Sequence, residues 1–214
     1  GDMKKLLLLL MILGVAALPA SLAHARALTI LDFEGFVYES DNTPGVVGFP
    51  PSNPGDVLAG CGLITGMSAP LTWSTDDYQY TWVLSDLVSI GEYDLGNGVI
   101  LIDYAGGALD IYADAYAGPG YTAPVHGIEP PNATAPSTFA DGNLYLHGVF
   151  SSFTMFYFPS LSTGQYEGML TFQLGSNLGE LENPAGYTFA GTVDPSGAIT
   201  IPTGYDLEAV GHID

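Results

Sequence analysis

The stretch Gly91–Asp114, GEYDLGNGVILIDYAGGALDIYAD, decides the fold class of this sequence. Apolar and polar residues alternate along it with the period of two that is typical of half-buried β-strands. The pairs Asn97-Gly98 and Gly106-Gly107 interrupt this alternation, and both are preferred hairpin turns because each central position needs positive φ. The stretch therefore predicts three antiparallel strands joined by tight turns.

Pairing outward from these two turns assigns the side chains to two faces. One face is predicted to be core, and it carries Tyr93, Ile100, Ile102, Tyr104, Leu109 and Ile111. The opposite, acidic face carries Glu92, Asp103 and Asp110 in a row across the three strands. Directly opposed like charges destabilise a strand pair, and a bound Ca²⁺ prefers carboxylate oxygens. The row therefore has two interpretations: a weak metal site with Ca²⁺ as its cofactor, or a hydrated acidic stripe.

The same alternation recurs along the rest of the chain and indicates one all-β domain over residues 28–214. Two segments rich in Pro and Gly, 42–54 and 117–136, are predicted loops. About a dozen short strands at this spacing favour an antiparallel β-sandwich of the jelly-roll kind, with a closed antiparallel β-barrel as the alternative. The predicted strands are 28–34, 36–40, 71–74, 78–84, 87–93, 99–104, 109–114, 143–150, 152–158, 165–174, 187–193, 198–201 and 205–213.

Two aromatic segments each have two interpretations. The predicted strand 78–84 places Tyr78, Tyr80, Trp82 and Leu84 on one face. This face is either the core side of the strand, which we favour, or a platform that stacks on sugar rings, and Trp73 is the expected exposed aromatic. The uncharged, Phe-rich segment 148–160 is either a central strand buried on both faces or, at a sheet edge, an assembly surface.

Residues 1–27 are predicted to be a signal peptide. Lys4-Lys5 form a basic head, the run Leu6–Leu18 is apolar, and two A-x-A endings close the segment at Ala25 and Ala27. Gly1-Asp2 are interpreted as an addition ahead of the natural start. We therefore expect a secreted protein with a periplasmic or extracellular location.

The charge of residues 28–214 is strongly one-sided. The sequence contains three Lys and Arg residues, and all of them, Lys4, Lys5 and Arg26, lie in the leader. Of the 23 acids only Asp2 precedes residue 28, so 22 remain without any Lys or Arg. Binding of nucleic acid through its phosphates is excluded because no cationic side chain displaces the counterions. Anionic membrane surfaces are unsuitable partners for the same reason, so neither nucleic acid nor a membrane is an expected partner.

The remaining chemistry-bearing residues form no catalytic motif. Cys61 is the single cysteine and is expected to be a small buried hydrophobe, with a disulfide between two chains as the alternative. The separations of His126, His147 and His212 match no zinc-ligand spacing, so these side chains are expected to be solvated. The sequence contains no G-x-S-x-G elbow and no phosphate-binding loop. Catalytic residues are therefore not predicted, and an enzymatic activity is not expected.

Four stretches carry a resemblance to a known group of proteins. They are YTWVL at 80–84, YAGGALDIYAD at 104–114, FADGNLYLHG at 139–148 and IPTGYD at 201–206. Together they resemble exported bacterial β proteins of the kind that often carry an exosortase-type sorting tail. The Pro-Glu-Pro, apolar and basic tail is not present in this sequence. The resemblance implies an exported β protein and supplies no activity.

These observations lead to three ranked expectations for function. The first is a non-enzymatic exported structural or surface protein that acts as a subunit of an extracellular assembly, with self-assembly as its interaction. The second is a carbohydrate-binding module supported by Ca²⁺, with a polysaccharide as partner, and the third is a secreted hydrolase. A long exposed edge strand would favour assembly, a concave face with exposed Tyr or Trp would favour sugar binding, and a deep pocket with paired carboxylates would favour the hydrolase.

Overall fold

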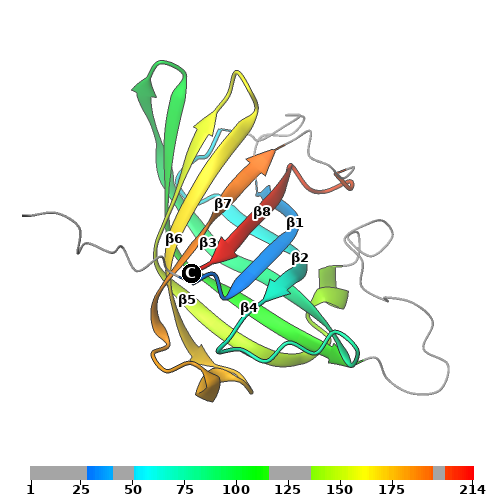
Figure 1. Cartoon of the computed structure of the whole chain (residues 1–214). Helices are drawn as coiled ribbons and strands as arrows, with labels where there is room; N and C mark the ends of the chain where they lie inside the picture. The colour runs from blue at the N-terminus through cyan, green and yellow to red at the C-terminus, as the bar shows by residue number, and fades with distance from the viewer. Residues whose placement is uncertain (1–27, 41–50, 116–135, 195–200) are drawn as a thin grey trace, which may run out of the picture.

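The computed structural model describes residues 28–40, 51–115, 136–194 and 201–214, and in them the chain forms a closed antiparallel β-barrel (Figure 1). The strands follow one another around the barrel in chain order, and the last pairs with the first. They are β1 (Leu31–Glu39), β2 (Val57–Met67), β3 (Tyr78–Gly96), β4 (Val99–Ala115), β5 (Asn143–Phe158), β6 (Thr163–Leu174), β7 (Ala185–Asp194) and β8 (Leu207–Ile213). Two 3₁₀ turns, η2 (Pro136–Phe139) and η3 (Leu178–Glu180), lie between strands. None of the helices in this described part is long and apolar enough to cross a membrane.

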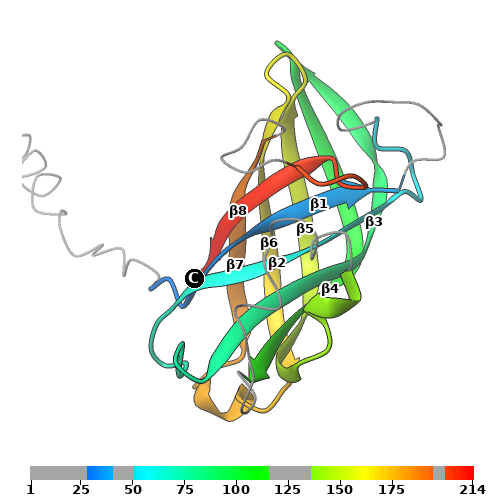
Figure 2. The same cartoon turned by 90° about the vertical axis from the view of Figure 1, so that its right-hand side faces the viewer.

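The barrel is uneven in height. The β3–β4 and β5–β6 hairpins extend well past the other strands at one end, as two views at right angles show (Figures 1 and 2). The opposite end carries the connection between β2 and β3 and the η3 turn. The two ends therefore differ in shape and in the loops that surround them.

The all-β expectation is confirmed, and the architecture is the barrel alternative rather than the sandwich. Each of the eight strands pairs with two neighbours, so the sheet closes, although residues 90–96 of β3 extend past β2 and pair only with β4. The sandwich prediction counted too many strands because it divided long strands at local irregularities. Single strands replace the predicted pairs 78–84 with 87–93, 99–104 with 109–114, and 143–150 with 152–158, and β1 covers residues 31–39 of the pair 28–34 with 36–40.

One strand was not predicted, and one predicted strand is absent. β2 was overlooked because its sequence, VLAGCGLITGM, contains three glycines and little alternation. Residues 71–74, predicted as a strand, lie in the irregular connection between β2 and β3. Most of the two predicted Pro- and Gly-rich loops, and most of the predicted strand 198–201, lie outside the described residues.

The prediction for the two turns is half right. Asn97-Gly98 joins β3 to β4, with φ of 55° and 76°. Gly106-Gly107 is not a turn, because it lies inside β4 opposite Leu87 and its neighbours. Its positive φ values, 70° and 89°, bend the strand, and the side chains that face inward change from even to odd positions there. Tyr104 and Leu109 are consequently both buried, as the turn had predicted.

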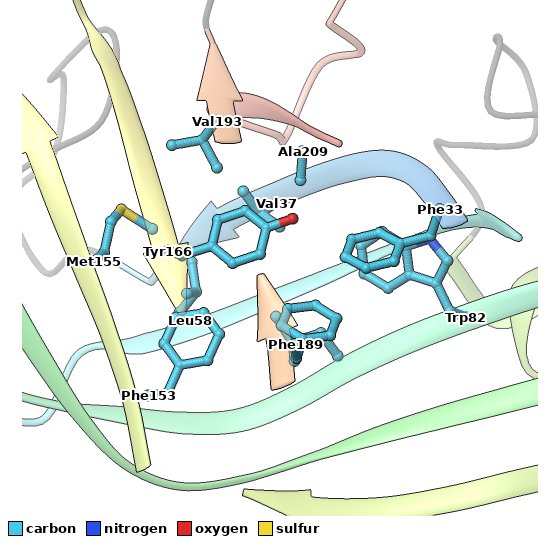
Figure 3. A pocket seen from close by; sticks show the side chains of 11 residues that line it. Phe33, Val37, Leu58, Trp82, Phe153, Met155, Tyr166, Phe189, Val193 and Ala209 are labelled. Carbon is cyan, nitrogen blue, oxygen red and sulfur yellow. The ribbon is translucent and has the colours of Figure 1, made fainter. Parts of the chain in front are cut away.

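The interior of the barrel is apolar and almost filled. Phe33 stacks on Phe189 with ring centroids 4.7 Å apart, and its edge meets Trp82 at 5.6 Å. The remaining cavity leaves about 10 Å³ for the centres of water-sized molecules, which is about enough for one water. An eight-stranded barrel is just wide enough for side chains to fill it or for one small ligand. Here the side chains fill it (Figure 3).

Glycines on the wall make this filling possible. A Cβ on Gly211 would lie 2.6 Å from both the Phe33 ring and the Tyr166 hydroxyl, and one on Gly62 would lie 2.7 Å from the indole nitrogen of Trp82. Real Cβ atoms do not approach other atoms so closely. The large aromatic side chains therefore lie directly against bare backbone.

Most of the predicted core is buried. Tyr80, Trp82 and Leu84 are at most 4% exposed, so the core interpretation of the strip on strand 78–84 is confirmed for these members. The predicted core residues of β4 are buried to the same degree except Ile100, which is half-buried. Tyr93 is an error of the prediction, since 48% of it is exposed on the projecting hairpin. Segment 148–160 is not buried on both faces, because Phe153 and Tyr157 point inward while Phe156 is 41% exposed. Cys61 is buried as expected.

Candidate functional site

The three acids predicted to form a metal-binding row are not brought together. Glu92 pairs with Ile102, and Asp103 lies opposite Gly91, because a bulge between Asp94 and Gly96, next to the turn, shifts the register by one residue. Asp103 and Asp110 lie on the same strand, seven residues and on the order of 20 Å apart. The pairing that created the row is therefore wrong. In the described ranges, no group of three or more His, Cys, Asp or Glu side chains is placed to hold a metal ion.

Each of these acids has a different local environment. Asp110 Oδ1 lies 2.5 Å from His147 Nδ1 across β4 and β5, where both side chains are about a quarter exposed. The Glu92 carboxylate accepts a hydrogen bond from the backbone N–H of Ser52 at 3.2 Å. His212 lies 3.4 Å from Asp214, and His126 falls outside the described residues. The two described histidines thus each have a carboxylate partner within 4 Å.

The principal candidate site is a cleft at the end of the barrel opposite the projecting hairpins. It has a volume of about 480 Å³, within the range of about 300–1,000 Å³ that is usual for ligand pockets. It lies where β3 begins, β4 ends and β5 begins, and the β2–β3 connection and the residues after β6 complete it. Its lining consists of Thr72, Ser74, Tyr78, Tyr80, Ala113, Asn143, Leu144, Tyr145, Ser176 and Asn177.

One side of the cleft is aromatic because every second side chain of β3 and β5 faces the barrel interior, and this pattern continues to the ends of both strands. Tyr80 and Tyr145 are buried and meet edge to face, with ring centroids 5.2 Å apart. Trp73 stacks on Tyr80 at 5.1 Å and supports it from outside the cleft lining. Tyr78, half-buried at the start of β3, extends this aromatic group toward solvent.

Glu180 joins the two loops that form the polar side. Its carboxylate accepts hydrogen bonds from the backbone N–H of Thr72 at 2.8 Å and from the Thr72 hydroxyl at 2.9 Å. It also accepts one from the side-chain amide of Asn177 at 2.9 Å. Hydrogen bonds to a charged acceptor are stronger than those between neutral groups. Glu180 therefore positions two lining residues that are more than 100 positions apart in the sequence.

The buried phenols of the cleft are held in their neutral form. Burial raises the pKa of Tyr80, and the nearby tyrosine Tyr78 and the carboxylates of Glu180 and Asp77 raise it further. Burial likewise raises the pKa of Tyr145, with the Glu180 charge as the next cause. Both side chains therefore remain hydrogen-bonding phenols over the physiological pH range.

A second polar group lies toward the other end and is closed to solvent. Ser52 donates to Glu39 at 2.5 Å, the hydroxyls of Ser52 and Ser89 lie 2.7 Å apart, and Tyr104 donates to Glu39 at 3.2 Å. All four residues are at most 5% exposed. Burial raises the pKa of Glu39 to about 7, against the opposing effect of these hydrogen bonds. Because the group is enclosed, it offers a ligand no direct contact.

A hollow of about 470 Å³ also lies beside the tip of the β3–β4 hairpin and is lined by Glu92, Asp94 and Pro159 among others. Both acids are exposed, and Asp94 accepts a hydrogen bond from the backbone N–H of Gly96 at 2.7 Å. Exposed carboxylates of this kind are satisfied by water and by local backbone groups. The hollow is a weaker candidate than the cleft because it lacks buried side chains that converge on a ligand.

The sequence indicated the aromatic part of the cleft but not its polar part. Tyr78 and Tyr80 lay on the strip for which sugar stacking was the less favoured interpretation, whereas Thr72, Asn143 and Asn177 were not singled out. No local pattern distinguishes these polar residues from other loop residues. Trp73, expected to be exposed, is half-buried. Comparison with protein-family models, curated proteins and solved structures finds no match to this chain.

Proposed function

We propose that this protein is a non-enzymatic carbohydrate-binding protein whose cleft holds a sugar residue of an oligosaccharide. The observation that carries the proposal is the combination, in one open cleft, of tyrosine rings with hydroxyl and amide side chains. Sugar rings have apolar C–H faces and a rim of hydroxyl groups. Amphipathic tyrosine rings suit the faces, and the polar side chains suit the rim.

The packed interior of the barrel favours a ligand that binds in the cleft at the end of the barrel rather than inside it. A cavity with space for about one water cannot accept a sugar or a fatty ligand. The cleft is about the right size for one or two sugar rings and opens to solvent, so a longer chain could extend from it. This geometry suits recognition of a polymer at a single residue or at its end.

The lining of the cleft favours binding over hydrolysis. Glycoside hydrolysis generally uses two carboxylic acids on either side of the scissile bond. Among the described residues, the side chains that line the cleft include none from Asp, Glu or His. Two carboxylates contact lining side chains: Glu180 accepts three hydrogen bonds from Thr72 and Asn177, and Asp77 accepts one from Ser74.

The decisive experiment measures sugar binding by the full chain and by two tyrosine variants. We expect isothermal titration calorimetry against neutral oligosaccharides to detect binding, and Tyr78→Ala to weaken it at least about tenfold, which is about 1.4 kcal/mol. Tyr93→Ala is the control, because Tyr93 is an exposed tyrosine on the hairpin at the other end of the barrel. Equal losses in both variants, or no binding of any oligosaccharide by the unmodified chain, would contradict the proposal.

Assembly is the second candidate function, and one observation favours it. Tyr93, Leu101 and Phe156 lie side by side across β3, β4 and β5 on the outer face of the projecting sheet. Tyr93 and Phe156 are 48% and 41% exposed. Exposed apolar patches often mark contacts between proteins. Such a contact would use these outward side chains, and residues 90–96 of β3, which pair only with β4, lie beside them at the edge of the projecting sheet.

A further inference from the structure

Two hydroxyl groups that line the cleft donate their hydrogens to carboxylates behind it. Thr72 Oγ1 donates to Glu180 at 2.9 Å, and Ser74 Oγ donates to Asp77 at 2.8 Å. The direction of these bonds is determined because an ionised carboxylate only accepts. A hydroxyl has one hydrogen, so both oxygens can only accept a hydrogen bond from a ligand.

Two further lining hydroxyls also donate their only hydrogen to an acceptor within the protein. Tyr145 donates to the carbonyl oxygen of Thr72 at 3.0 Å, and a carbonyl only accepts. Ser176 donates to the side-chain oxygen of Asn177 at 2.7 Å. The orientation of that amide is determined in turn, because its nitrogen donates to the Glu180 carboxylate at 2.9 Å. The polar side of the cleft is therefore rich in acceptors, with the remaining N–H groups of Asn143 and Asn177 as amide donors.

The electrostatic environment of the cleft agrees with this pattern. Glu180 and Asp77 lie directly behind its hydroxyls, and residues 28–214 contain no Lys or Arg to neutralise them. The same carboxylates help to raise the pKa of Tyr80, after burial and Tyr78, which indicates a negative potential at the phenols. A ligand that brings positive charge and N–H donors is favoured here, whereas one that brings only acceptors is not.

We propose that the cleft selects a sugar with a free, protonated amino group over the same sugar with an N-acetyl or a carboxylate group. This inference rests on the proposed function, because it specifies the sugar that the cleft binds. An ammonium group has three N–H donors and no acceptor, so it can donate hydrogen bonds to several of these hydroxyl oxygens at once. A cation near the face of Tyr78 gains a further cation–π attraction. A carboxylate or sulfate would meet lone pairs and like charge.

The test compares three matched tetrasaccharides by calorimetry with the full chain: one of glucosamine, one of N-acetylglucosamine and one that contains glucuronate. We expect the free-amine tetramer to bind about tenfold more tightly than the N-acetyl tetramer, and the glucuronate tetramer to bind more weakly than either. Glu180→Gln and, separately, Asp77→Asn should each reduce the preference for the amine. Glu167→Gln, which removes one charge from the exposed outer face of β6, should leave the preference unchanged.

The outcomes separate this inference from the function on which it rests. If the N-acetyl tetramer binds and the free amine brings no gain, amine selectivity is overturned and sugar binding stands. Amine selectivity is likewise overturned if Glu167→Gln lowers the preference as much as Glu180→Gln, since net charge alone then explains it. If none of the tetramers binds, the proposed function itself is overturned. The comparison of ligands on the unmodified chain needs no variant, so it remains informative even if Glu180→Gln unfolds.

Discussion

At the scale of single residues, Glu39 shows how enclosure changes the chemistry of a carboxyl group. It is 5% exposed and hydrogen-bonded to Ser52 and Tyr104, while Asp56 and Asp206 are close enough to disfavour its charge. Desolvation is the largest effect and raises its pKa from 4.5 to about 7. Near neutral pH the buried group is therefore about half protonated, and it takes up a proton on folding.

This shift predicts a pH-dependent stability. Between about pH 4.5 and 7 the folded state holds a proton that the unfolded state has lost, so the free energy of unfolding falls as pH rises through this window. The contribution of Glu39 amounts to about 3 kcal/mol, which is present at low pH and lost above about pH 7. Urea unfolding at several pH values should show that Glu39→Gln flattens this slope, while Glu167→Gln on the outer face does not. An unchanged slope in Glu39→Gln would show that other groups cause it.

The sequence predicted which residues of a strand are buried in the core better than it predicted which residues of different strands and loops are in contact. Tyr80 and Trp82 were assigned to the core because alternation along one strand is a local signal, and both are buried. The polar side of the cleft depends on Glu180 bonding to Thr72, 108 positions away. The metal row failed because a single bulge between Asp94 and Gly96 moved Glu92 out of register with Asp103. Contacts between strands depend on register, and alternation does not report a bulge.

At the scale of elements, glycines have two structural roles within the strands that the sequence does not distinguish. Gly62 lies inside β2 because the Trp82 ring and the backbone of β1 leave no space for a Cβ. Gly106-Gly107 bends β4 so that Tyr104 and Leu109 can both face inward. Glycine is normally a sign of turns and weak strands. A glycine that makes room for an aromatic ring can be recognised only once the partner strand is known.

The projecting sheet carries a prediction about self-association. If the outer patch that contains Tyr93, Leu101 and Phe156 contacts another copy, the native mass should increase with protein concentration. Phe156→Asp should then keep the chain monomeric, because it places a charge in the apolar contact of an already acidic molecule. Sedimentation or light scattering would measure this, with Met169→Asp on β6 as an exposed control outside the three-residue patch. A wild-type chain that stays monomeric at every concentration would remove assembly as a function of this face.

At the scale of the whole molecule, fold class was predictable and closure was not. Period-two alternation is enough to predict an all-β domain, because every strand has one face in the core. Whether such strands form two sheets or one closed barrel depends on the length of each strand and on the stagger between neighbours. Irregularities such as those at Gly106-Gly107 and between Phe150 and Ser152 made single strands look like two. The larger number of shorter strands then favoured a sandwich.

The charge of the molecule yields the last prediction. Residues 28–214 carry 22 acids and no Lys or Arg, so their repulsion opposes the compact state at neutral pH. Raising NaCl from about 10 mM to about 150 mM shortens the screening length from about 30 Å to about 8 Å. We expect this to stabilise the fold by about 1 kcal/mol, which raises Tm by about 2–4 °C for a domain of this size.

Calcium provides the control that separates screening from a bound ion. At equal ionic strength, CaCl₂ should raise Tm about as much as NaCl, because Glu92, Asp103 and Asp110 do not converge on one point. A clearly larger effect of CaCl₂, abolished by chelator, would mean that a specific site exists elsewhere in the chain. No change with either salt would mean that the acids lie far enough apart, in enough water, for their mutual repulsion to be negligible. Differential scanning calorimetry in the two salts distinguishes these cases, since a specific site saturates at low CaCl₂ concentration whereas screening rises gradually with ionic strength.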